Sequence, residues 1–246
     1  GDLAANGQGA PLVPKFHAAL ADWLDLDRST GIAIHNIGGI SNLTYLGPKV
    51  ITLAFDTGPG NTWIDAAATL ATRGRMNMDK DGKRAALGHP DHAAIHTILK
   101  NSFFGRAAPK STGRDEFPFS LLRSHTRATG NDLIRTATEL TAESIARAYE
   151  TQILGKHLPL SQVFVCGGGA KNPSLMRALE HRLSKIRVSV LTKWDPHFVE
   201  AAAFAYFGAL ALRGEALGGS WTGARGFGPP AQITPGENWA RVTARL

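Results

Sequence analysis

The stretch A-F-D-T-G-P-G-N-T-W-I-D, residues 54–65, carries the chain from an apolar run through a glycine-rich turn into an Ala- and Leu-rich segment. We expect a strand over residues 50–55 and a helix over residues 62–72, with Asn61 as the N-cap of that helix. Asp56 stands at the end of the strand beside two glycines, which leave its carboxylate without side-chain cover. Such a carboxylate is suited to accept a proton from an attacking hydroxyl or water, and equally to cap the following helix or bind backbone amides of the turn.

Short β-branched runs and longer helical segments alternate around this stretch. The turn N-I-G-G-I-S-N, residues 36–42, separates the expected strands at 32–34 and 43–46, both of which precede residues 54–65. The other expected elements are strands at 32–34, 43–46, 163–165 and 187–191, helices at 92–99, 131–154, 173–183 and 200–212, a loop at 105–119 and a surface tail from residue 214. This alternation predicts an α/β domain with a mixed, largely parallel sheet, antiparallel opening strands and flanking helices.

Composition argues against several classes of protein. The chain has 43% apolar and 19% charged residues, which is the composition of a globular protein. Its 246 residues are enough for one large domain or two small ones. The net charge of +7 permits an anionic partner, but the basic residues are scattered, which argues against nucleic acid. The single cysteine, Cys166, excludes an internal disulfide, and the longest apolar run, 198–212, is too short to span a bilayer. We therefore expect a cytoplasmic protein without a membrane partner.

Three loops that follow strands are rich in glycine, at 36–42, 56–61 and 166–172. In open α/β sheets such loops gather at one edge, where exposed backbone amides bind phosphate. A phosphate-rich ligand is therefore favoured, although the motifs of P-loop, dinucleotide-binding and serine-hydrolase proteins are absent. Glu200, at a helix start, is a second candidate carboxylate, or simply a favourable charge on the first helical turn.

Two other patterns resemble metal sites only superficially. D-K-D-G at 79–82 departs from a calcium loop in its later positions, and we expect a turn there. His89, His92 and His96 lie near one another without the cysteines or carboxylates that would complete a zinc site, so we expect them at the surface.

Several segments occur in an order that is specific when taken together. They are G-Q-G-A-P-L-V-P (7–14), N-I-G-G-I-S-N, F-D-T-G-P-G-N, P-K-S-T-G-R-D, E-L-T-A-E-S-I-A, V-C-G-G-G-A-K-N-P and T-G-A-R-G (222–226). In this order they resemble the anhydro-N-acetylmuramic acid kinases, a family of the acetate and sugar kinase, heat-shock protein 70 and actin superfamily. The resemblance spans essentially the whole chain.

The resemblance implies an actin-like ATPase (ribonuclease H-like) lobe, with ATP and magnesium as cofactors. The implied reaction is hydrolysis of the 1,6-anhydro ring of anhydro-N-acetylmuramic acid and phosphorylation to N-acetylmuramic acid 6-phosphate in cell-wall recycling. Asp56 would be the general base that activates water, and Glu200 and Asn61 would bind the sugar. The implied nucleotide-binding residues are Asn36, Gly38, Gly39, Gly167, Gly168, Gly169 and Asn172. We assign no side chain to a metal, and a homodimer is left open because family members commonly dimerise.

The chain departs from the family pattern in two places. It begins inside a family segment and lacks an earlier loop of the form D-G-T-S-x-D-G-x-D, which is the first phosphate-binding turn of the family. In addition, the segment at 192–199 contains fewer residues than the corresponding segment of the family pattern. We therefore expect a fragment, with 1–30 a remnant of the first lobe and 31–246 the nucleotide-binding second lobe. Because catalysis in this superfamily needs both lobes, we expect little or no phosphoryl transfer by the chain alone. The alternatives are a non-catalytic nucleotide-binding fragment, another sugar kinase of the superfamily, or an acyl-group hydrolase that uses Asp56 differently.

Overall fold

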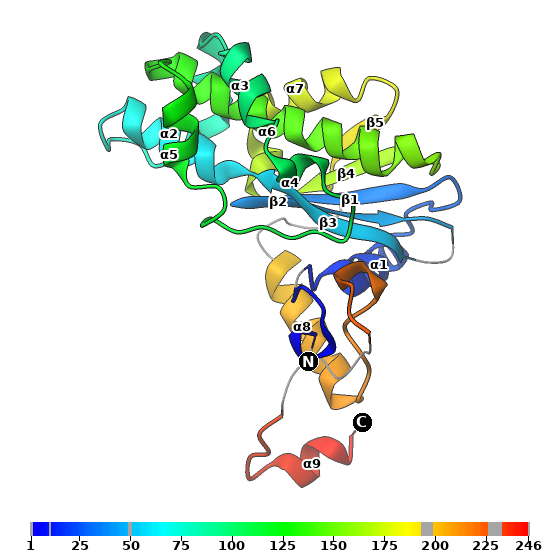
Figure 1. Ribbon diagram of the computed structural model, residues 1–246. Coiled ribbons are helices and arrows are strands. Elements are labelled where there is room, and N and C mark those ends of the chain that lie inside the picture. Colours follow the sequence, from blue (N-terminus) through cyan, green and yellow to red (C-terminus); the bar gives the residue numbers. More distant parts are fainter. Residues whose placement is uncertain (1, 10, 49–50, 193–198, 226–232, 246) are drawn as a thin grey trace.

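The computed structural model describes residues 2–9, 11–48, 51–192, 199–225 and 233–245, which contain a five-stranded mixed sheet (Figure 1). The strands are β1 Ile32–Ile37, β2 Ile40–Leu46, β3 Ile51–Pro59, β4 Gln162–Cys166 and β5 Arg187–Val190. Their order is β3-β2-β1-β4-β5, in which β1, β2 and β3 pair antiparallel while β4 and β5 continue the sheet in parallel. This is the strand order and direction of a ribonuclease H-like sheet, and the predicted fold class is confirmed.

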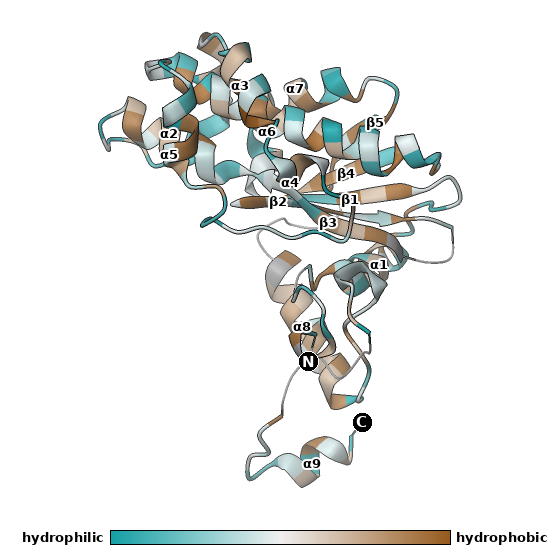
Figure 2. Cartoon of the chain, viewed as in Figure 1, coloured by the Kyte–Doolittle hydropathy of each residue, from teal (hydrophilic) through white to brown (hydrophobic). Residues whose placement is uncertain are grey.

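Helices cover both faces of the sheet (Figure 1). One face carries α2 Asn61–Ala71, α3 His92–Ile98, α4 Ser102–Gly105, α5 Phe119–His125, α6 Gly130–Gln152 and α7 Pro173–Arg182. The other face carries α1 Pro14–Trp23 and α8 Val199–Leu212, and α9 Trp239–Thr243 lies farthest from the sheet. Short 3-10 helices are η1 Leu3–Ala5, η2 Lys80–Gly82, η3 Ala85–Leu87, η4 Leu154–Lys156, η5 Gly168–Lys171 and η6 Ser220–Thr222. Figure 2 shows α8 as mostly apolar along its length.

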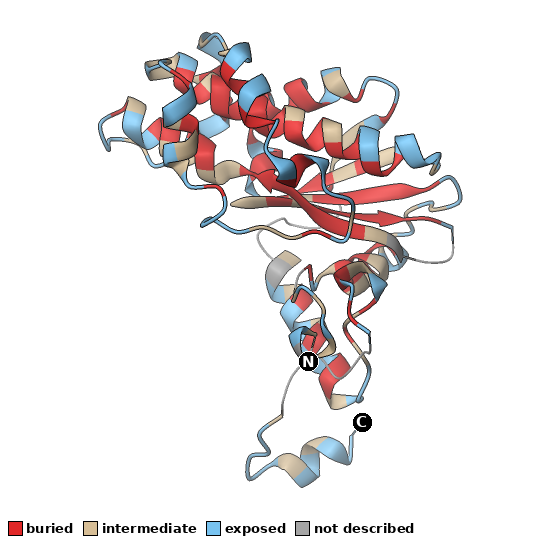
Figure 3. Cartoon of the chain, in the orientation of Figure 1, coloured by how far each residue is buried: buried red, intermediate tan, exposed pale blue. Residues whose placement is uncertain are grey.

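The central strand β1 has two apolar faces. Ala33 and Ile37 enter the larger core, to which α6 contributes, whereas Ile32 and Ile34 enter a second core with α1 and α8. Successive side chains of a strand point to opposite faces, so a strand covered on both sides is apolar at nearly every position. The strands are accordingly mostly buried (Figure 3). Burying each large apolar side chain contributes roughly 1.5–3 kcal/mol, which makes the sheet a firm support for the turns at its ends.

Helix α6 joins α7 to the sheet through a buried acid. Glu139 of α6 is 4% exposed and forms ion pairs with Arg135 at 2.5 Å and with Arg182 of α7 at 2.6 Å. A buried carboxylate is tolerated only with such partners. The helix that follows the 166–172 turn is thereby fixed against the main core.

The helices and strands expected from the sequence are present, with corrections to one cap, one strand boundary and the number of helices. Asn61 is not the N-cap of α2: Gly60 occupies that position, and Asn61 is the first helical residue, with its side-chain amide donating to the Ile37 carbonyl at 2.9 Å. The helices α1, α4, α5 and α9 were not expected, although Pro14 at the first position of α1 and the spacing of Phe16 and Leu20 indicate a helix. Residue 50 of the expected strand 50–55 lies outside the described residues, and the strand continues to Pro59, so Asp56 lies within β3 rather than at its end because β2 pairs with β3 as far as Pro59.

The N-terminal segment and the tail after α8 lie together. The amide of Gln8 donates to the Thr222 carbonyl at 2.9 Å, and the amide of Arg225 donates to the Ala5 carbonyl at 2.8 Å. Helix α1 shares its core with β1, and the proposed division between residues 30 and 31 stays a prediction. In the part of the chain that the structure describes, no helix combines the length and the apolar character needed to cross a membrane.

Candidate nucleotide and sugar site

The turn between β1 and β2 is tied to the start of α2. The carbonyl of Gly38 accepts a hydrogen bond from the Asn61 amide at 2.7 Å, and the carbonyl of Gly39 accepts one from the Gly60 amide at 2.9 Å. These bonds satisfy amides at the helix N-terminus, which would otherwise lack partners. The amides of Gly38 and Gly39 find no acceptor among the described residues, so they remain available to a ligand.

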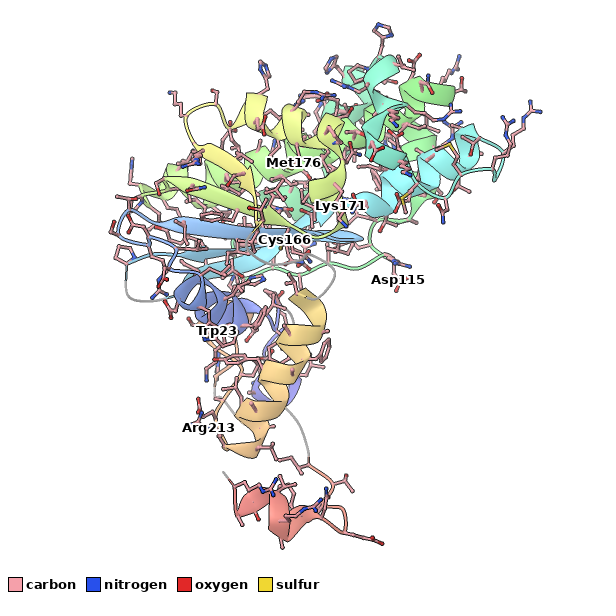
Figure 4. All side chains as sticks on the ribbon, turned by 180° about the vertical axis from the view of Figure 1, so that it is seen from behind. Trp23, Asp115, Cys166, Lys171, Met176 and Arg213 are labelled. Atoms are coloured by element: carbon pink, nitrogen blue, oxygen red, sulfur yellow. The ribbon has the colours of Figure 1, made fainter. Side chains whose placement is uncertain are left out.

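The turn after β4 packs directly against the end of β1. Gly167 has a φ of +79°, and a Cβ there would lie 2.3 Å from Oδ1 of Asn36. A Cβ on Gly169 would lie 2.4 Å from Cγ2 of Ile37. Glycine is therefore needed at both positions, at Gly167 for the backbone conformation as well as for space. In Figure 4, Cys166 marks the end of β4 and Lys171 the last part of this turn before α7.

The first and third turns line one hollow of about 430 Å³, on the face of the sheet that carries α1 and α8. Its lining residues are Val13, His17, Asn36, Gly38, Gly39, Ile40, Gly167, Gly168, Val199 and Ala203. The second turn, before α2, is joined to the first by the Gly60 and Asn61 amides. The structure thus brings together five of the residues assigned to the nucleotide: Asn36, Gly38, Gly39, Gly167 and Gly168.

Asn172 and Gly169 lie to one side of this hollow. Oδ1 of Asn172 accepts hydrogen bonds from the amides of Ser174 and Leu175 at 3.0 and 3.1 Å, so the side chain caps α7. Gly169 is buried against Ile37. These two residues shape the turn, and a direct contact of either with a nucleotide stays a prediction.

Polar residues form a row across the same face of the sheet. Asp56 of β3 pairs in register with Asn42 of β2, which pairs with Asn36 of β1. Oδ1 of Asn42 is buried and has no hydrogen-bond partner among the described residues. A buried polar atom without a partner is costly, so an acceptor in this position is well placed for a donor on a ligand. Asp56 lies at the far end of the row and does not itself line the hollow.

Asp56 is held at the edge of the sheet by the segment that follows α4. Oδ2 accepts the amide of Thr112 at 2.8 Å, and the Asp56 amide donates to the Lys110 carbonyl at 3.0 Å. The side chain is 6% exposed, and it does not cap α2. Burial raises its pKa to about 6, against the opposing effects of the Thr112 amide and the Lys110 charge. The expected binding of amides in the turn is therefore not observed, since the amide bound belongs to Thr112 in the 105–119 loop, and the function of Asp56 as a base stays a prediction.

Lys110 and Arg114, in the loop before α5, occupy different environments. The Lys110 ammonium is buried over the ring of Phe103 at 4.6 Å and donates to the Phe103 carbonyl at 3.0 Å. Burial lowers the pKa of Lys110 to about 8, assisted by the nearby charge of Arg106. Arg114 is exposed, and its Nη2 lies 3.5 Å from the position that a Cβ on Gly39 would occupy. Of these two cations, Arg114 is therefore the one that lies beside a glycine turn.

His17 of α1 lines the hollow but was not expected from the sequence. It is 1% exposed, and Nδ1 lies 2.8 Å from Oγ1 of Thr44 in β2. Burial lowers its pKa to about 4, so the ring is neutral at pH 7. The helical spacing of residues 14–23 was the signal that would have placed His17 beside the sheet.

Two further sequence expectations have different outcomes. Glu200 lies in α8, but its side chain is outside the described residues, so its role in sugar binding stays a prediction. The three histidines 89, 92 and 96 are exposed, as expected. Within the described ranges, no group of three or more His, Cys, Asp or Glu side chains is arranged to hold a metal ion by itself.

Comparison with known proteins gives a consistent result over most of the chain. A family model for anhydro-N-acetylmuramic acid kinase matches residues 1–228. A protein of that name from Acidithiobacillus ferrooxidans is 38% identical over 100% of this chain and 63% of its own length. Another from Pseudomonas savastanoi is 40% identical over 87% of this chain and 57% of its own length. The chain thus spans about three fifths of the length of these relatives.

Among solved structures, similarity extends to component A of (R)-2-hydroxyglutaryl-CoA dehydratase from Acidaminococcus fermentans. The two chains are 16% identical with a TM-score of 0.45, over 80% of this chain and 68% of the other.

Proposed function

Because the chain belongs to the anhydro-N-acetylmuramic acid kinase family, we propose that it is the nucleotide-binding lobe of an ATP-dependent sugar kinase. The proposed reaction opens the 1,6-anhydro ring of anhydro-N-acetylmuramic acid with water and transfers phosphate to the freed 6-oxygen, as a step of cell-wall recycling. The observation that carries the proposal is that glycine turns far apart in the sequence line one hollow with free amides, beside a polar row that ends at Asp56.

The turns fit a nucleotide triphosphate. The amides of Gly38 and Gly39 have no acceptor among the described residues, and backbone amides at such turns bind phosphate oxygens well. Arg114, beside Gly39, adds positive charge at the rim. Glycine at position 167 lets this turn pack against the end of β1, since a Cβ there would lie 2.3 Å from Oδ1 of Asn36.

Magnesium fits as an ion that arrives with the nucleotide. It is commonly held by phosphates, waters and one or two carboxylates rather than by a protein cage, and we assign it no side chain here. Magnesium-ATP, when bound, supplies the phosphoryl group and neutralises the charge that develops during its transfer.

Asp56 is the proposed general base. With a pKa of about 6 it is mostly ionised at pH 7 yet basic enough to take a proton, as general catalysis near neutral pH requires. The Thr112 amide fixes Oδ2 and leaves Oδ1 to accept the proton of water. As Asp56 takes its proton, the water oxygen bonds to the anomeric carbon while the bond from that carbon to the 6-oxygen breaks. The 6-oxygen then bonds to the γ-phosphorus as the bond from that phosphorus to the bridging oxygen breaks, and ADP leaves.

His17 is a proposed polar contact to the sugar or the phosphates, and Asn42 is a proposed acceptor for a hydroxyl of the sugar. His17 lines the hollow as a neutral ring that Thr44 orients, and Asn42 offers a buried carbonyl oxygen without a partner among the described residues. Asn61 contributes indirectly, since its side chain holds the end of β1 through the Ile37 carbonyl. Glu200 remains the proposed second acid in sugar binding.

The test uses the protein expressed from its complete natural gene, incubated with magnesium-ATP and anhydro-N-acetylmuramic acid in ¹⁸O-labelled water. We expect a phosphorylated sugar that carries one ¹⁸O at the anomeric carbon. Asp56→Asn should reduce the rate by about 10³-fold or more, in line with loss of an essential base. Asp25→Asn, which removes an exposed carboxylate at the end of α1, is the matched control.

The outcomes separate the alternatives. Nucleotide binding without any sugar product would favour a non-catalytic nucleotide-binding module. Phosphorylation of other sugars, but not of the anhydro sugar, would favour another kinase of the superfamily. Product without ¹⁸O, or full activity of Asp56→Asn, would contradict the role of Asp56.

A further inference from the structure

A second hollow, of about 400 Å³, lies beside the first. Its lining comes from α2, from residues 78–81 and from the turn before α7: Asn61, Ile64, Asp65, Met78, Asp79, Lys80, Asp81, Gly168, Lys171 and Asn172. Gly168 lines both hollows. A ligand anchored on the glycine amides of the first hollow can therefore continue into the second across a residue that has no side chain.

Several polar side chains of the second hollow are already engaged in the fold. Asn61 donates to the Ile37 carbonyl, and Asn172 caps α7. The carboxylate of Asp79 accepts the amides of Arg84 and Ala85, both at 2.9 Å. Asp81 lies 3.3 Å from the ammonium of Lys83.

Asp65 differs from these residues. It follows Asn61 by one helical turn of α2, so both side chains lie on the face of the helix toward this hollow. Its carboxylate is partly buried and has neither a hydrogen bond nor an ion pair among the described residues. Burial raises its pKa to about 6, so at pH 7 it is an ionised acceptor that has lost part of its hydration without a replacement.

We propose that Asp65 accepts hydrogen bonds from the ribose hydroxyls of the nucleotide whose phosphates lie on the glycine turns. This inference rests on the proposed nucleotide-binding function and adds a residue that selects ribonucleotides. An ionised carboxylate has two acceptor oxygens and no donor, which matches two neighbouring hydroxyl donors. Hydrogen bonds to a charged group are the stronger kind, and a ligand without the hydroxyls would leave this carboxylate unpaired in the complex.

The test compares ATP with 2′,3′-dideoxy-ATP, both with magnesium, by isothermal titration calorimetry on the purified chain. We expect the wild-type chain to bind ATP at least tenfold more tightly than the dideoxy compound, a difference of about 1.4 kcal/mol. Asp65→Asn should bind ATP about tenfold more weakly and reduce the preference to less than threefold, while its affinity for the dideoxy compound stays within threefold of wild type. Asp25→Asn, an exposed site with the same change of charge, should behave as wild type.

Asp65→Ser is a second variant in case Asp65→Asn does not fold, and it should lose the preference in the same way. Equal binding of the two nucleotides by the wild-type chain would overturn the proposal without any variant, and so would a preference that survives both substitutions. In either of these cases ATP still binds, so the proposed kinase function stands. Failure of both nucleotides to bind at millimolar concentration would instead contradict the nucleotide-binding function and this inference with it.

Discussion

The backbone amide of Asp56 donates to the carbonyl of Lys110 at 3.0 Å, while the ammonium of Lys110 lies away from the carboxylate, over the ring of Phe103 at 4.6 Å. Asp56 faces the side of the sheet that carries the hollow, and Phe103 belongs to the core of the opposite side. Lys110 thus holds β3 through its backbone carbonyl and places a buried positive charge on the opposite side of the sheet. The Lys110 charge lowers the pKa of Asp56, partly offsetting the effect of burial.

Replacing Lys110 by methionine tests this relationship. Lys110→Met removes the charge but keeps a long apolar side chain, so the pKa of Asp56 should rise further. The acidic limb of the pH profile of kcat/KM should move to higher pH by several tenths of a unit to about one unit. Lys100→Met, at an exposed position after α3, is the control and should leave the limb unchanged. An unchanged limb in Lys110→Met would show that the Lys110 charge does not reach Asp56.

Replacing Asp56 by asparagine should stabilise the fold near neutral pH. Because burial raises the pKa of Asp56 from 3.8 to about 6, the folded chain binds the proton more tightly than the unfolded chain does. The free energy of unfolding therefore falls as the pH rises through this window, by at most about 3 kcal/mol. Asp56→Asn retains an acceptor for the Thr112 amide. Its free energy of unfolding should be about 1–2 kcal/mol higher than that of wild type at pH 7.5 and nearly equal to it at pH 4. Urea denaturation at both pH values measures this, and equal effects at the two values would exclude the linkage.

Replacing Gly167 by alanine should damage both the turn and the nucleotide site. Its φ of +79° disfavours a side chain, and the added Cβ would lie 2.3 Å from Oδ1 of Asn36 and 2.8 Å from the Ile37 carbonyl. We expect a loss of about 1–3 kcal/mol in stability and at least tenfold weaker ATP binding. Gly113→Ala, where a Cβ meets no atom within 4 Å, should have neither effect. Thermal unfolding and calorimetry measure the two quantities, and an unaltered ATP affinity would place the phosphates away from this turn.

His17 should remain neutral well below the usual range of histidine. Burial lowers its pKa from 6.5 to about 4, and the unfolded chain therefore binds more protons than the folded one between these values. Its contribution to the free energy of unfolding consequently decreases as the pH falls from about 6.5 to about 4. Nitrogen-15 chemical shifts of the imidazole should report a single neutral tautomer from pH 8 to pH 5. A ring that titrates near pH 6.5 would mean that His17 is open to water in solution.

Much of the fold follows from local sequence, because hydrophobic periodicity and turn-forming residues act over a few neighbouring positions. The spacing of Leu133, Leu140 and Ile145 predicts α6, and the β-branched runs that bracket N-I-G-G-I-S-N predict the first hairpin. Helix α8 shows the limit of this reasoning. It is apolar around its circumference, so its sequence does not distinguish buried Phe207 from Phe204, which is 65% exposed.

The expected cap at Asn61 was wrong for a related reason. Propensity favours asparagine at an N-cap, but a neighbouring turn already supplies acceptors for the first amides of α2 through the Gly38 and Gly39 carbonyls. The Asn61 side chain is thereby free to bind the Ile37 carbonyl. Such a partner, 24 residues away in the chain, is not visible in a local pattern.

The sequence by itself determined the alternating elements and the glycine turn between the first two strands, because each depends on neighbouring residues, whereas the expectation that Asp56 ends its strand was wrong, since β3 continues to Pro59. Only the tertiary structure decided that the turns share a hollow, that His17 joins them from α1, and that Asp65 remains without a partner among the described residues. It also decided the pKa of Asp56, since burial and the Lys110 charge come from a segment more than fifty residues away. Strand order and packing bring these groups together, and no local propensity encodes those distances.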